Sequence, residues 1–61
     1  MKEILEKYCI QITNNSYSKT QSEELIFDLL DNNEVMLCIN SKYITTFSQS
    51  KKLEMFFESL E

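Results

Sequence analysis

A chain of 61 residues with ten carboxylate side chains, six lysines, no arginine and no histidine carries a net charge of −4. This balance disfavours nucleic-acid binding, because duplex recognition relies on a dense basic surface and on the forked donors of arginine. The absence of histidine and glycine also excludes a histidine acid–base catalyst and the glycine-rich phosphate loops of nucleotide-binding enzymes.

The length allows a single small domain, residues 1–61, near the lower limit for independent folding. Area scaling predicts that about 10,600 Å² of unfolded surface falls to about 4,200 Å² on folding. If about 60% of the lost area is apolar, burial supplies about 95 kcal/mol, against about 90 kcal/mol for ordering the chain. Because these two terms nearly cancel, we expect help from a partner protein or a second copy.

The first residues contain two glutamates and lack the apolar stretch of a secretory signal, and no apolar run is long enough to span a membrane. We therefore expect a cytoplasmic protein. Glycine, alanine, arginine and proline, whose codons are GC-rich, are all missing. This bias indicates an AT-rich genome, such as that of a low-GC bacterium, a phage or a plasmid.

Residues 2–12 fit two structures. On a helix, most of the apolar residues fall in one stripe of about 140°. These residues are Ile4, Leu5, Tyr8, Cys9 and Ile12. As a strand, residues 8–13 alternate Tyr8, Ile10 and Ile12 with more polar neighbours. We favour the helix, because its stripe accounts for more residues, and keep the strand as the alternative.

The next segment, residues 14–19 (NNSYSK), is polar and rich in turn-forming side chains, so it predicts a loop. Tyr17 is the only aromatic residue in this segment. A lone aromatic side chain in a loop either packs back on the core or contacts a partner. Tyr17 is therefore a candidate protein-contact residue.

A capping box, Thr20-Gln21-Ser22-Glu23, predicts a helix over residues 21–31. Four apolar residues would form its inner face, and these are Leu25, Ile26, Leu29 and Leu30. Asp31-Asn32-Asn33 would then end the helix, because asparagine tolerates the left-handed conformation that glycine usually supplies.

Residues 35–39 and 43–47 predict a β-hairpin that turns on Asn40-Ser41-Lys42. With a two-residue loop, Cys38 faces Tyr43. With a three-residue loop, five residues gather on the core side, and Met36, Cys38, Ile44 and Thr46 lie on the other. The core set of this second register is Val35, Leu37, Ile39, Tyr43 and Phe47. We favour the second register, because its core face is more hydrophobic.

In either register the second face of the hairpin keeps apolar groups, so helices cover it or a partner uses it. Met36 and Ile44, which share the second face in the favoured register, are candidate protein-contact residues.

The last residues predict a helix from about Ser50 to Leu60, with Ser48 or Ser50 as its cap. Its apolar stripe is narrow and belongs to the core, and it contains Leu53, Phe56, Phe57 and Leu60. Met55 points away from this stripe, so we expect it to be exposed and include it among the candidate contact residues.

No residue pattern points to catalysis, a cofactor or a metal. Cys9 and Cys38 cannot form a metal set without histidine, and we expect two buried thiols, with a Cys9–Cys38 bridge as the alternative. No base or cationic helix end accompanies either cysteine, and the carboxylates lie on expected solvated faces. We therefore expect no catalytic residue and no enzymatic activity.

These segments predict an α+β domain in the order helix, helix, β-hairpin, helix, or a three-stranded sheet with two helices if residues 8–13 form a strand. The expected function is a small acidic protein-binding module, a regulator or inhibitor that acts by contact with another protein. The alternative is a structural homo-oligomer whose apolar surface is its own subunit interface. Nucleic-acid binding through Lys42, Lys51 and Lys52 ranks third.

Overall fold

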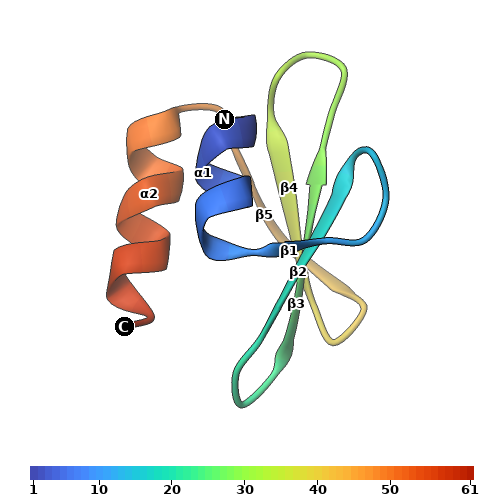
Figure 1. Cartoon of the computed structure of the whole chain (residues 1–61), viewed down its shortest axis with the longest axis vertical. Helices are drawn as coiled ribbons and strands as arrows, with labels where there is room; N and C mark the ends of the chain where they lie inside the picture. Colours follow the sequence, from blue (N-terminus) through green and yellow to red (C-terminus); the bar gives the residue numbers. More distant parts are fainter.

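The computed structural model describes residues 1–61 as a five-stranded antiparallel sheet with two helices on one of its sides (Figure 1). The strands follow one another in the sheet in chain order, from β1 to β5. The elements are α1 (Lys2–Tyr8), β1 (Ile10–Gln11), β2 (Ser16–Thr20), β3 (Glu24–Leu29), β4 (Val35–Ile39), β5 (Lys42–Phe47) and α2 (Ser50–Ser59). The predicted helix–helix–hairpin–helix order is therefore wrong, and the three-stranded alternative contains too few strands.

The N-terminal segment divides between its two predicted structures. Helix α1 ends at Tyr8, because Cys9 takes an extended backbone conformation (φ −125°, ψ 166°). The chain then pairs Ile10 with Ser18 as the short edge strand β1. The helix prediction is thus correct for the first seven residues of the segment and wrong for its end.

The loop predicted at residues 14–19 and the helix predicted at residues 21–31 are both wrong, because these segments pair as β2 and β3. Of the capping-box residues, Thr20 ends β2, and the other three form the turn between the two strands. Along β3, Leu25 and Phe27 are buried while Glu24 is exposed, which is the alternation of a strand with one covered face. The polar strand β2 is held by its neighbours on both sides, so its local composition did not decide its structure.

The turn between β3 and β4 uses asparagine in the predicted way. Asn33 has a φ of 65°, and the side-chain oxygen of Asn32 accepts a hydrogen bond from the backbone of Glu34 at 3.1 Å. The left-handed asparagine is confirmed, but it joins two strands instead of ending a helix.

The hairpin of β4 and β5 is confirmed, and it contains both predicted registers. Beside the turn, Cys38 faces Tyr43, as a two-residue loop requires. At the far end, Val35 faces Phe47, as in the three-residue register. A β-bulge joins the two halves, and Ile44 is the extra residue, because Leu37 already faces Thr45.

Asn40 in the hairpin turn is hydrogen-bonded to the neighbouring β2–β3 turn. The φ of Asn40 is 50° and that of Ser41 is 70°, which is the pattern of a type I′ turn. The Asn40 side chain accepts a hydrogen bond from the backbone of Glu24 at 3.2 Å and donates one to Glu23 at 3.1 Å. This arrangement replaces the glycine that such turns usually contain.

The C-terminal helix α2 is confirmed, with Leu53 and Phe57 fully buried. Its serine cap is wrong, since Gln49 occupies the N-cap position and makes no side-chain capping bond. Phe57 joins the two helices to the sheet, because its ring stacks on Tyr8 at 4.8 Å and packs on Phe27 at the same centroid distance.

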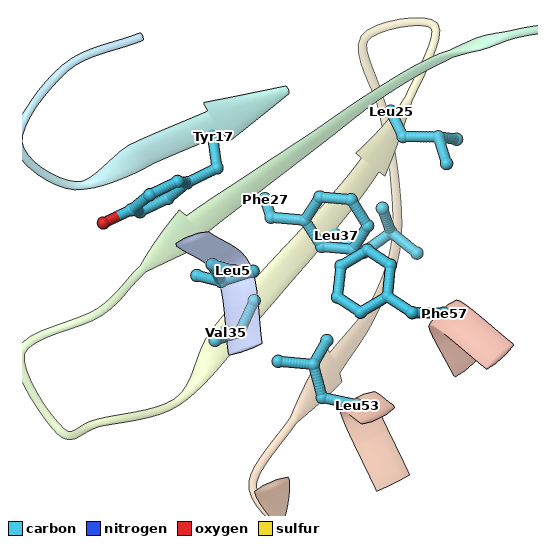
Figure 2. Close-up of a cluster of buried hydrophobic side chains, with 8 residues drawn as sticks. All are labelled: Leu5, Tyr17, Leu25, Phe27, Val35, Leu37, Leu53 and Phe57. Atoms are coloured by element: carbon cyan, nitrogen blue, oxygen red, sulfur yellow. The ribbon is translucent and has the colours of Figure 1, made fainter. Parts of the chain in front are cut away.

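The core lies between the sheet and the two helices and is formed by eight side chains (Figure 2). They are Leu5, Tyr17, Leu25, Phe27, Val35, Leu37, Leu53 and Phe57. The strand members of this set occupy alternate positions, so all of them point to the side of the sheet that carries the helices. The opposite side of the sheet has no covering layer (Figure 1).

Candidate protein-binding surface

The uncovered side of the sheet, which we call the open face, is built from two cross-strand rows of outward side chains. The strand registers place Ile10, Ser18, Ile26, Cys38 and Tyr43 in one row, which we call the apolar row. The second row, which we call the acidic row, contains Ser16, Asp28, Met36 and Thr46. Thr20 and Glu24 extend the open face beyond the apolar row.

The apolar row crosses the whole width of the sheet and exposes large hydrophobic groups at both ends. Ile10 on β1 is 75% exposed, and Tyr43 on β5 is 61% exposed. Ile26 on β3 and Cys38 on β4 lie half-buried between them. Single exposed hydrophobic residues are ordinary, but a row that spans five strands is typical of a surface that meets another molecule.

The acidic row carries one charge at its centre. Asp28 is half-buried on β3 and accepts a hydrogen bond from the hydroxyl of Ser16 on β2. On its other side it faces Met36 on β4. The carboxylate therefore has one protein donor and depends on water for its remaining hydrogen bonds.

The four contact candidates from the sequence do not share one surface. Met36 lies on the open face and is half-buried, and Ile44 at the bulge of β5 is 50% exposed. Met55 is 57% exposed, as expected, but belongs to α2 on the opposite side of the sheet. Tyr17 is fully buried in the core, so it is not a surface residue.

Sequence reasoning missed the members of the apolar row. The signal for Ile26 was the alternation in residues 24–29, where Leu25 and Phe27 share the other side of the strand. The signal for Tyr43 was the two-residue register, which placed it beside Cys38. The favoured register assigned Tyr43 to the core. Because of the bulge at Ile44, Tyr43 instead pairs with Cys38 and points to the open face.

The two cysteines are free thiols in different surroundings. Burial of Cys9 at the end of α1 raises the pKa of its thiol to about 11, and the charge of Lys19 opposes this shift in part. Cys38 lies on the open face, in the middle of the apolar row. Both cysteines are half-buried, so the expected buried position holds in part for each of them, and the bridge between them is absent.

The structure has no pocket and no group of three side chains suited to holding a metal ion. Neither helix has the length and apolar character needed to cross a membrane. No protein-family model matches the chain, and no curated protein or solved structure is significantly similar to it.

Proposed function

We propose that this chain is a small acidic protein-binding module, a regulator or inhibitor that acts by covering a surface of another protein with its open face. The observation that carries the proposal is the apolar row, which leaves Ile10 and Tyr43 more than half exposed on a sheet face without a covering layer. Burying such a row removes apolar area from water, which is the main favourable term in protein association. The proposed action needs contact and no catalytic group.

The size of the molecule is compatible with this role. A standard interface covers about 800 Å² on each partner, and the whole chain exposes 4140 Å². Such a contact takes roughly a fifth of the molecular surface, which corresponds to one of its sides. Both helices lie on the other side, so binding at the open face leaves the core packing of Leu53 and Phe57 unchanged.

The competing proposal is a structural homo-oligomer in which a second copy covers the same face. It rests on the same apolar row, but the charges of the open face argue against it, as described below. Light scattering of the purified chain separates the two proposals, because it needs no foreign partner.

The proposal is tested by photo-cross-linking from the rim of the open face. A single thiol is placed at residue 20 by Thr20→Cys in a Cys9→Ala, Cys38→Val background, because Thr20 is exposed and points outward on β2. The thiol carries a benzophenone probe, and the labelled chain is irradiated in a lysate of a low-GC bacterium. The matched control places the probe on α2 by Met55→Cys.

We expect the probe at residue 20, and not the probe at residue 55, to join the chain to a discrete protein. Excess unlabelled wild-type chain should abolish this product, whereas excess Tyr43→Ser chain should not, because it lacks one end of the apolar row. A product that both competitors suppress equally would contradict the proposed surface. So would a product formed from residue 55 alone.

A further inference from the structure

We propose that the partner surface that covers the open face presents lysine or arginine side chains beside apolar ones. This inference rests on the proposed function and specifies the chemistry of the partner. Every charged side chain at an outward strand position is a carboxylate, and these are Glu24 and Asp28. The apolar row provides the contact area, and the two carboxylates favour a partner surface of positive charge.

None of the six lysines occupies an outward strand position on the open face. Four of the six belong to the helices. The other two occupy helix-facing strand positions, since Lys19 pairs with the core residue Leu25, and Lys42 pairs with Ile39. The ammonium group of Lys19 lies 3.5 Å from the backbone oxygen of Tyr8 at the end of α1. No cation of the chain is therefore placed to neutralise Asp28.

The turns that flank the open face reinforce the negative charge. Between residues 10 and 49 the chain has five carboxylates and two lysines. Glu23 precedes β3, Asp31 follows it, and Glu34 precedes β4. The sheet and its turns thus carry most of the net charge of −4.

Covering the open face also removes water from Asp28. Its carboxylate has only the Ser16 hydroxyl as a protein donor. A buried carboxylate without a compensating charge is costly, so an apolar partner surface alone would lose much of the gain from burying the apolar row. A lysine or arginine opposite Asp28 supplies both the charge and the missing donors.

A second copy of the chain does not meet this requirement. Face-to-face association places the carboxylates of both copies in one interface, and the outward positions of that interface contain no lysine. Like charges in an interface suppress association. The occupant that fits the open face is therefore a foreign protein with a cationic, partly apolar surface.

The test uses three synthetic heptapeptides in which valine alternates with lysine, with serine or with glutamate. Each is titrated into the ¹⁵N-labelled chain, and the backbone amide shifts are followed by NMR. We expect the lysine peptide to shift the amides of Ser18, Ile26 and Cys38, with weaker binding as the salt concentration rises. The glutamate peptide should cause no shift, and the serine peptide should bind more weakly than the lysine peptide.

Two charge variants connect the effect to the open face. Asp28→Asn and Glu24→Gln should each weaken binding of the lysine peptide by about two- to fivefold, the range of a partly exposed ion pair. The matched control, Glu58→Gln, makes the same change in net charge on α2 and should leave the affinity unchanged. Asparagine at position 28 still accepts from Ser16, so the fold is retained.

The outcomes separate the inference from the proposed function. Equal binding of the serine and lysine peptides overturns the cationic partner and leaves the protein-binding surface in place. Shifts confined to β5 mean pairing at the sheet edge and overturn the inference too. The absence of shifts with all three peptides overturns it as well, and the cross-linking result then decides the proposed function independently. Amide shifts that depend on the concentration of the chain alone assign the open face to a second copy.

Discussion

The hydroxyl group of Tyr17 is buried without a hydrogen-bond partner, although its ring is fully packed in the core. Figure 2 shows this hydroxyl pointing away from the other core side chains. A buried hydroxyl without a partner costs about 1–3 kcal/mol in proteins. Tyr17→Phe removes the cost and keeps the ring, so we expect it to raise the free energy of unfolding by about 1 kcal/mol.

Thermal unfolding followed by circular dichroism measures this change, with an expected rise of about 4–8 °C in Tm for a domain of this size. Tyr43→Phe is the matched control, because the Tyr43 hydroxyl is exposed and lies 3.0 Å from that of Thr46. It should change the stability by less than about 0.5 kcal/mol. A marked loss of stability in Tyr17→Phe would show that its hydroxyl has a partner.

Ser41 is a second residue whose conformation lowers the stability of the fold. It has a φ of 70° in the hairpin turn, a conformation that costs a residue with a Cβ atom about 1 kcal/mol relative to glycine. Ser41→Gly creates the Asn-Gly pair that type I′ turns prefer, and we expect it to stabilise the chain by about 1 kcal/mol in urea unfolding. Ser48→Gly, at a position without positive φ, should not stabilise it.

At the scale of elements, the bulge in β5 decides which side chains reach the open face. Ile44 has no partner on β4, because the pairing passes from Leu37–Thr45 to Cys38–Tyr43. Deleting Ile44 leaves every one of these pairs available in one continuous ladder. We therefore expect the deletion variant to fold with Tyr43 still on the open face and Phe47 still on the core side.

Nuclear Overhauser contacts between Val35 and Phe47 and between Cys38 and Tyr43 check the deletion variant directly. The control is deletion of Met36 from β4, where no bulge absorbs the change between β3 and β4. This deletion shifts the part of β4 on one side of position 36 by one residue, so that its side chains move to the opposite face of the sheet. The chain should therefore lose its cooperative unfolding transition. A cooperative fold after deletion of Met36, or its loss after deletion of Ile44, would contradict this account of the register.

At the scale of the whole molecule, burial and charge act against each other on the open face. The surface of 4140 Å² agrees with the area expected for a folded chain of this mass. The apolar row favours association, whereas the carboxylates around it oppose association with an identical face. We therefore expect a monomer at micromolar concentration and moderate salt.

Light scattering across a chromatography peak, with reductant present, measures the molar mass of the chain and so checks whether it is a monomer. Raising the salt to about 1 M shortens the screening length to about 3 Å, so weak self-association should appear only there. A stable dimer at low salt would contradict the charge argument and assign the open face to a second copy. The Asp28→Asn variant should self-associate at lower salt than the wild-type chain.

Local patterns predicted the hairpin of β4 and β5 and the helix α2, but not the hairpin of β2 and β3, whose paired residues are equally near in sequence. The alternation in residues 35–39 and the asparagine at position 40 specify the hairpin, and the stripe with Leu53 and Phe57 specifies α2. Residues 21–31 instead fit both a helix with a capping box and a strand. The segment forms a strand because β2 and β4 pair with it on both sides and satisfy its backbone hydrogen-bonding groups. A local sequence pattern does not show that these pairing partners exist.

The sequence by itself determined the charge, the absence of recognisable catalytic motifs, the hairpin of β4 and β5, and the core face of α2. These properties depend on composition or on residues a few positions apart. Only the tertiary structure decided that Tyr17 is buried and that Ile10, Ile26 and Tyr43 form one row. Both results depend on which segments pair as strands and in which register, and the position of Tyr43 depends also on the bulge residue. A shift of one residue in register reverses the side to which each side chain points.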